Sequence, residues 1–219
     1  MLRGVLLDID GTLLLSNRAH AEAWSDTFRE FGHTIPPERI EPLIGMGGDK
    51  LLATLIPGMS DSDGQGKEMS SRRQKVFLER YAPHLQPAPG ARALIQRLKD
   101  QGLALVMATS AKGDELSTLL QRAGIEDLIE QATTSDEVDQ SKPDPDIVHA
   151  ALEKGGLAPA EAILVGDTPY DVEAGKRAGV RVIAVRCGGH AGDLQGAIAV
   201  YDDPHDLFVH LEDTPLHRR

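Results

Sequence analysis

The sequence predicts an α/β fold, with a Rossmann-like doubly wound parallel sheet as its core and an inserted α-helical domain. Short apolar runs alternate with segments of helical periodicity over most of the chain, which is typical of parallel strands covered by helices on both faces. Residues 17–85 interrupt this alternation, because their pattern is helical throughout. We therefore expect a core domain of residues 1–16 and 86–219, and an inserted domain, called the cap below, of residues 17–85.

Short apolar runs predict the strands, and their continuous rather than alternating character indicates burial on both faces of a sheet. They cover residues 5–9, 103–108, 131–134, 162–165, 180–185 and 197–201. Helices are expected between them, with Gly124, Gly155 and Gly179 at positions typical of C-terminal caps. These helices cover residues 90–101, 113–123, 144–154 and 171–178.

In the inserted segment, apolar and aromatic residues recur at three- and four-residue spacing, which predicts a buried helix face. They are His20, Ala23, Trp24, Thr27, Phe28 and Phe31. We expect His20 and Trp24 to pack in the interior of this domain. A polar loop at residues 60–66 and a further helix at about 67–81 complete the cap.

Composition limits the location and the partners of the protein. A formal net charge of -11 argues against a nucleic-acid-binding or anionic-membrane surface, which would carry a basic patch. The single cysteine, Cys187, excludes an internal disulfide, fits a reducing compartment and is expected to be unreactive. The first apolar run is short and broken by Asp8, so it predicts no signal peptide, and no run has the length of a membrane span. We therefore expect a cytoplasmic protein.

Polar clusters follow the predicted strands. They are Asp8 and Asp10, Thr109–Ser110, Ser141–Lys142–Pro143, and Gly166–Asp167 through Asp171. In open α/β sheets ligands bind beyond the carboxyl ends of the strands, so all four clusters are expected at one edge. Each has an alternative interpretation as a turn or a helix N-cap, with Asp144 as the cap after Lys142. The alternative becomes weak when the four are considered together.

Together, the residue types in these four clusters suit phosphoryl transfer. Asp8 and Asp10 are two residues apart on a strand, so their side chains share a face, and their repulsion calls for a cation. Ligands that are all oxygen indicate a hard ion such as Mg2+. Hydroxyl groups and the Lys142 ammonium can hold phosphate oxygens, and an aspartate can act as a nucleophile that becomes phosphorylated.

With these four motifs in this order, the chain resembles the haloacid dehalogenase superfamily, in particular its phosphatases with a helical C1 cap after the first strand. The segment Ser16–Asn17, His20 and Ala23–Trp24 resembles the cap entry of the phosphoglycolate phosphatase branch, which is related to β-phosphoglucomutase. Leu15 departs from the pattern, since many relatives carry an acidic residue there.

The resemblance implies a role for each motif. Asp8 is the nucleophile and a Mg2+ ligand. Asp10 is the general acid and base, and its backbone carbonyl is the metal ligand. Asp167 is the second carboxylate on the metal, and Asp171 supports the metal or orients Lys142. Thr109 and Ser110 grip the phosphoryl group while Lys142 neutralises its charge.

In the cap, the glycine-rich segment of residues 45–48 has two interpretations. It is either a flexible joint or a loop in which Gly47, together with the nearby Lys50, contacts the leaving group. A loop at residues 188–190 is expected to border the site, and residues 216–219 are expected to form a frayed tail.

The function expected from the sequence is Mg2+-dependent hydrolysis of a small-molecule phosphate ester, either phosphoglycolate or a sugar phosphate, by a monomer or homodimer. Three alternatives stay open. The first is a phosphomutase resembling β-phosphoglucomutase, and the second is a phosphonoacetaldehyde hydrolase with a Schiff base on Lys50. The third is a protein of the same fold that binds without catalysing a reaction.

Overall fold

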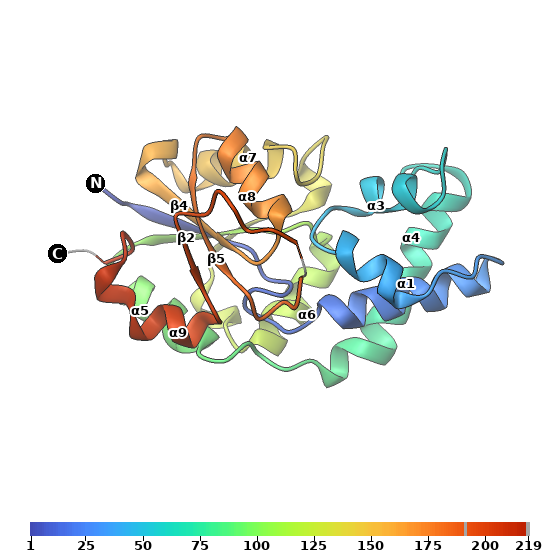
Figure 1. Cartoon of the computed structure of the whole chain (residues 1–219), viewed down its shortest axis with the longest axis horizontal. Helices are drawn as coiled ribbons and strands as arrows, with labels where there is room; N and C mark the ends of the chain where they lie inside the picture. Colours follow the sequence, from blue (N-terminus) through green and yellow to red (C-terminus); the bar gives the residue numbers. More distant parts are fainter. Residues whose placement is uncertain (191, 218–219) are drawn as a thin grey trace.

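Six parallel strands form the sheet, in the spatial order β3-β2-β1-β4-β5-β6. They are β1 (Gly4–Leu7), β2 (Ala104–Ala108), β3 (Gln131–Thr133), β4 (Ala162–Gly166), β5 (Arg181–Val185) and β6 (Ala199–Tyr201). The computed structural model describes residues 1–190 and 192–217, and Figure 1 shows helices on both sides of the sheet and a separate helical lobe beside it. The predicted fold class and all six predicted strands are confirmed.

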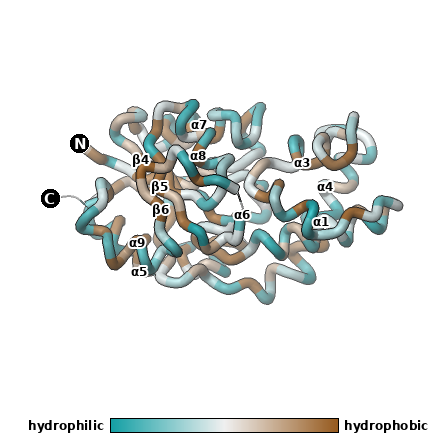
Figure 2. Tube along the Cα trace, in the orientation of Figure 1, coloured by the Kyte–Doolittle hydropathy of each residue, from teal (hydrophilic) through white to brown (hydrophobic). Residues whose placement is uncertain are grey.

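Burial of the central strands explains their continuous apolar character. Strand β1 lies between β2 and β4, with Leu6 opposite Val106 on one side and Leu164 on the other. Val5 and Leu7 belong to the apolar cluster on one face of the sheet, whereas Leu6 belongs to the cluster on the opposite face. Figure 2 shows this concentration of hydrophobic residues on the strands. Both faces therefore anchor the strand whose exit carries Asp8.

Five helices pack around the sheet. They are α5 (Ala91–Asp100), α6 (Gly113–Ala123), α7 (Asp146–Gly155), α8 (Pro169–Arg177) and α9 (Pro204–Val209). The four predicted core helices are confirmed, and α9 was not predicted. Helix α7 begins after Asp144 and ends one residue later than expected, because Gly156 rather than Gly155 adopts the left-handed C-cap conformation, with φ of 60°. Short helical turns join these elements at residues 126–128, 135–137, 159–161 and 211–213.

The cap is built from α1 (Asn17–Glu30), α2 (Pro37–Ile40), α3 (Gly48–Leu55) and α4 (Gly64–Val76), which continues as a π-helical turn, Phe77–Tyr81. Helix α4 begins within the segment predicted to be a loop. Short turns follow α2 at residues 41–43 and the π-helical turn at residues 82–84. A third apolar cluster forms the interior of the cap, and the expected packing of Trp24 is found there. The boundaries at residues 16/17 and 85/86 stay a prediction.

Contacts between the lobes are also apolar. Ala23, Val76 and Phe77 of the cap belong to the same cluster as Leu7 of the sheet.

Near the C-terminus Leu216 is fully buried, which contradicts the expected frayed tail at that residue. Residues 218–219 lie outside the described part of the chain. No helix among the described residues combines the length and the hydropathy needed to cross a bilayer.

Replacing Phe28 by alanine tests the cap interior. Phe28 is fully buried and stacks on Trp24, with ring centroids 5.2 Å apart. We expect Phe28→Ala to lower the free energy of unfolding by about 3–5 kcal/mol, because it leaves a cavity. Urea denaturation measures the change. Val209→Ala, at a side chain that is 60% exposed, serves as the control and should change it by less than about 0.5 kcal/mol. Equal losses of unfolding free energy in both variants would contradict the placement of Phe28 in the interior of the cap.

Candidate active site

The structure brings four of the predicted site residues together beyond the carboxyl end of the sheet. Asp8 follows β1, and its backbone N–H donates to the carbonyl of Val165 in β4 at 2.9 Å. Asp167 follows β4, Asp171 lies in the first turn of α8, and Lys142 lies in the loop before α7. All four side chains are buried.

Lys142 is the only cation in this group. Its side chain is fully buried, and its Nζ donates to Oδ1 of Asp8 and to Oδ1 of Asp171, both at 2.7 Å. Asp171 is fixed by the N-terminal capping box of α8, in which its Oδ2 accepts from the backbone N–H of Thr168 at 3.0 Å and from the Thr168 hydroxyl at 2.6 Å. The helix start therefore orients Asp171 toward the lysine.

Asp8 and Asp167 share a hydroxyl. The Thr12 Oγ1 lies 3.1 Å from Oδ2 of Asp8 and 3.1 Å from Oδ1 of Asp167, although its one hydrogen can serve only one acceptor at a time. Asn17, the first residue of α1, donates to the other Asp167 oxygen at 2.8 Å and to the Gly188 carbonyl at 3.0 Å. The loop at residues 188–190 thus borders this cluster, as expected.

The crowding of carboxylates shifts their proton affinities. Burial raises the pKa of Asp8 to about 7 against the attraction of Lys142, and Asp171 adds to the rise. Burial, together with repulsion by Asp171 and Asp8, also holds the pKa of Asp167 well above its ordinary value. For Lys142, burial favours the neutral form, but the two neighbouring carboxylates outweigh it and raise its pKa.

This donor set fits a divalent cation. Asp8, Asp167 and Asp171 each offer a carboxylate oxygen, and these oxygens lie within 4.8 Å of one another. When all three are ionised, one lysine compensates a single charge and two negative charges stay uncompensated. Buried oxygen ligands with a surplus of negative charge suit a hard ion such as Mg2+. The Asp10 carboxylate does not belong to this set, so its ligand role through the backbone stays a prediction.

Asp10 is held instead by Ser16, just before α1, and by His20 of the cap. Its Oδ1 accepts from the Ser16 hydroxyl at 2.5 Å and lies 2.8 Å from Nε2 of His20, whose ring stacks on Phe77 at 3.9 Å between centroids. Burial alone would raise the pKa of Asp10, but His20, Ser16 and Arg73 hold it below its ordinary value. The expectation that His20 only packs in the interior is therefore incomplete.

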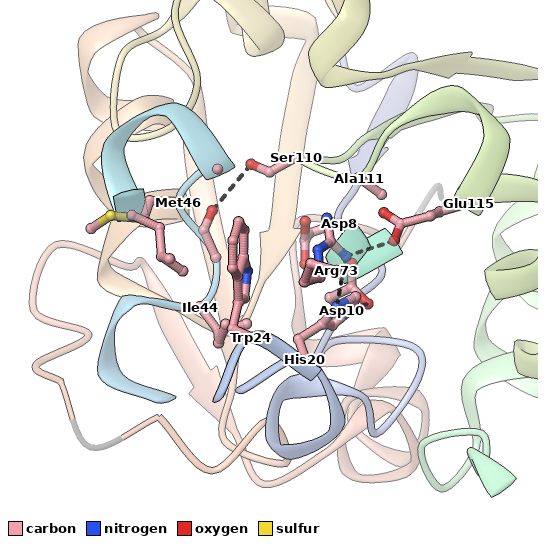
Figure 3. A pocket seen from close by; sticks show the side chains of 13 residues that line it. Asp8, Asp10, His20, Trp24, Ile44, Met46, Arg73, Ser110, Ala111 and Glu115 are labelled. Carbon is pink, nitrogen blue, oxygen red and sulfur yellow. Dashed lines mark hydrogen bonds and ion pairs between the residues drawn. The ribbon is translucent and has the colours of Figure 1, made fainter. Parts of the chain in front are cut away.

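A cavity of about 50 Å³ lies at this site, lined by residues of both the cap and the core (Figure 3). Its lining residues include Asp8 and Asp10 of the core and the apolar side chains of Trp24, Ile44 and Met46 of the cap. Arg73 of α4 and Glu115 of α6 also line it, and sequence analysis missed both. One signal was available for Arg73, since it lies four residues after Met69 and three before Val76 on the buried face of α4.

Of the other predicted site residues, some line the cavity and others form hydrogen bonds away from it. Ser110 lines the cavity, and its hydroxyl donates to the Gly45 carbonyl at 3.1 Å, whereas the fully buried Thr109 accepts from the backbone N–H of Ala111 at 3.0 Å. Lys50 is turned away, because its ammonium bonds to the Ser141 carbonyl and to Oδ2 of Asp144 at 2.6 Å.

Gly47 likewise contacts the core, because its backbone N–H donates to the Ser141 hydroxyl at 3.1 Å. Neither Gly47 nor Lys50 belongs to the residues that line the cavity, so their contact with the leaving group stays a prediction. Cys187 lies beside the site with its Sγ 3.2 Å from the Gly11 carbonyl, and burial and Asp167 raise its pKa to about 12, in line with an unreactive thiol.

Comparisons with known proteins agree with this geometry. The family described as haloacid dehalogenase-like hydrolases matches residues 5–185. A phosphoglycolate phosphatase of Rhodospirillum rubrum is 31% identical over 212 residues, which cover 93% of this chain and 88% of that protein.

Two solved structures are also similar. A hydrolase from Pseudomonas syringae has a TM-score of 0.87 and 29% identity, covering 96% of this chain and 98% of that one. A putative β-phosphoglucomutase from Bacteroides vulgatus has a TM-score of 0.82 and 26% identity, covering 96% and 88%. The fold therefore recurs over nearly the whole chain in solved structures.

Cation binding at the carboxylates is tested by thermal unfolding of metal-stripped protein. Because Mg2+ is expected to bind the folded state only, a concentration of 100 times Kd should stabilise it by about 2.7 kcal/mol and raise Tm. Asp167→Asn should remove most of this shift, while the exposed control Asp202→Asn should keep it. An equal Mg2+-induced shift in both variants would place the cation elsewhere.

Proposed function

Because this chain belongs to the haloacid dehalogenase-like hydrolase family, as an enzyme of the phosphatase class, we propose that it hydrolyses the phosphate ester of a small metabolite with Mg2+ as cofactor. The observation that carries the proposal is the buried group of Asp8, Asp167, Asp171 and Lys142 at the end of the sheet. A cytoplasmic location and a monomeric or homodimeric state belong to the same proposal.

Asp8 is the proposed nucleophile. One of its carboxylate oxygens attacks phosphorus, the bond between phosphorus and the ester oxygen breaks, and Asp10 gives its proton to the departing alcohol. Water then attacks the aspartyl-phosphate and gives a proton to Asp10, which releases inorganic phosphate and restores Asp8. Lys142, already 2.7 Å from Asp8, offsets negative charge during both steps.

The cofactor would be held by Asp8 and Asp167, with Asp171 nearby and Asp10 contributing its backbone carbonyl. There it would neutralise negative charge on the phosphate oxygens. Thr109 and Ser110 stay the residues proposed to bind the phosphoryl group, and Ser110 lines the cavity.

Asp10 needs a proton at the start of the reaction. In the structure its pKa is held low by His20, Ser16 and Arg73, so it favours the ionised form. A phosphate dianion bound beside it would raise that pKa, because a like charge disfavours ionisation. His20, 2.8 Å away, is the group with which Asp10 can share a proton, and we assign His20 a positioning role.

The alternatives differ in their support. A phosphomutase would use the same core, and the similarity to a putative β-phosphoglucomutase keeps it as the second candidate. Incubation with a sugar 1-phosphate separates the two, since a mutase yields an isomeric ester without inorganic phosphate. A Schiff base on Lys50 is disfavoured because that ammonium is paired with Asp144 outside the cavity.

Removing the nucleophile gives the most direct test. Asp8→Asn keeps the shape of the side chain but removes its negative charge, so phosphate release from p-nitrophenyl phosphate with Mg2+ should fall by about a thousandfold or more. Asp202→Asn should retain full turnover. Substantial activity in Asp8→Asn would exclude Asp8 as the nucleophile, and no activity in the unaltered, Mg2+-loaded protein would favour the binding protein.

The role of His20 is tested with two leaving groups. His20→Asn should lower kcat for glycerol phosphate by about 10²-fold, since an alkoxide needs a proton from Asp10 as it departs. For p-nitrophenyl phosphate the loss should be much smaller, because nitrophenolate leaves without protonation. Equal losses with both esters would indicate a purely structural role for the ring.

A further inference from the structure

A buried ion pair connects the cap to the core beside the proposed catalytic carboxylates. Arg73 Nη1 of α4 donates to Glu115 Oε1 of α6 at 2.6 Å. Arg73 is 8% exposed and Glu115 is fully buried, and both line the cavity that contains Asp8 and Asp10 (Figure 3). The Arg73 guanidinium also lies over the Trp24 ring, 5.4 Å from its centroid. The pair is therefore part of the surface that a bound substrate would meet.

Each member of this pair keeps an unused polar atom. Arg73 Nε, a donor, and Glu115 Oε2, an acceptor, are buried and have no hydrogen-bond partner within the described structure. Buried polar groups without partners are unfavourable, so a ligand group that satisfies both is favoured. A hydroxyl both donates and accepts, whereas a carboxylate only accepts. The unsatisfied pair therefore matches a hydroxyl.

The charge of the cavity lining also favours a hydroxyl over a carboxylate. Arg73 is the only arginine or lysine among its described lining residues, and Glu115 already balances it. A carboxylate that captured Arg73 would leave Glu115 buried without a counter-charge, which is strongly unfavourable. Asp8 and Asp10 add further negative charge. Lys50, which could have offered positive charge, is bound to Asp144 elsewhere.

A second cavity adjoins the first, because Gly48, Arg73 and Ser110 line both. It has a volume of about 360 Å³, and its lining includes further serines, namely Ser62, Ser70, Ser71, Ser135 and Ser141. Ser70 is 1% exposed and its hydroxyl has no partner in the described structure. Its charged lining residues are Asp49, Asp61, Asp136, Asp139, Lys67, Lys112 and Arg73, so acidic side chains outnumber basic ones. Hydroxyl-rich walls without surplus positive charge suit a polyhydroxylated, uncharged ligand.

We propose that Arg73 and Glu115 are specificity determinants that bind a hydroxyl of a neutral leaving group, so that the substrate is the phosphate monoester of a sugar or other polyol. Esters whose leaving group carries a carboxylate, such as phosphoglycolate, are poor substrates. The inference rests on the proposed phosphatase function and selects among the substrates which that function leaves open.

Two matched esters test the proposal. Glycerol 3-phosphate and 3-phosphoglycerate differ at one carbon, which is a hydroxymethyl group in the first and a carboxylate in the second. We expect kcat/KM of the unaltered enzyme to favour glycerol 3-phosphate by about tenfold or more. Glu115→Gln removes the negative charge with little change of shape, and it should shift the ratio of the two kcat/KM values toward 3-phosphoglycerate by about tenfold.

The control is Glu126→Gln, an exposed position beyond the end of α6, where the same loss of charge should leave the ratio unchanged. A ratio measured on one preparation does not depend on the fraction that is folded. If Glu115→Gln fails to fold, a preference of the unaltered enzyme for 3-phosphoglycerate still overturns the proposal.

The outcomes separate the two claims. Preference of the unaltered enzyme for 3-phosphoglycerate, or an unchanged ratio in Glu115→Gln, overturns the assignment of Arg73 and Glu115 and leaves the phosphatase intact. No phosphate release from either ester or from p-nitrophenyl phosphate, with Mg2+ present, overturns the phosphatase function and this inference with it.

Discussion

The site depends on three buried carboxylates, two of which are bridged by one buried ammonium. Ionised carboxylates are costly to remove from water unless they are paired and hydrogen-bonded. Lys142 bridges Asp8 and Asp171, and Thr12 and Asn17 supply hydrogen bonds to the oxygens that the lysine does not reach. These contacts hold the carboxylates in place without neutralising them. A divalent cation would relieve the remaining repulsion. The same residues that make the site unfavourable on its own therefore suit it to bind such a cation.

The fold makes this crowding possible. Strand β1 is buried on both faces and paired on both sides, so Asp8 leaves the sheet at a position fixed by two apolar clusters. Asp167 leaves the neighbouring strand β4 at the same edge, and the capping box at Thr168 turns Asp171 back toward the same point. Apolar packing of the strands therefore balances the electrostatic strain at their ends.

Sequence reasoning could predict this part because its signals are local. Continuous apolar runs marked the strands, and the polar residues at their exits marked the edge where the site lies. For the contacts between the cap and the core, the sequence gives no local signal that identifies the partner of each residue. The partner of Arg73 is 42 residues away and that of Lys50 is 94 residues away, so neither ion pair follows from spacing along a helix. His20 fitted an apolar stripe, and only the folded structure reveals that the same ring reaches Asp10.

The similarity to known proteins extends over nearly the whole chain, whereas the proposed selectivity for the leaving group rests on two residues. The similar proteins share the fold over nearly the whole chain, and the polar residues at the strand ends of this chain indicate the reaction class. Discrimination between an acid and an alcohol requires only that a few buried polar groups be left unpaired by the wrong ligand. Arg73 and Glu115 come from different lobes, lie outside all four strand-end clusters, and compensate each other's charge. Similarity to these relatives therefore supports the class of reaction, whereas the substrate has to be inferred from the residues that line the cavity of this chain.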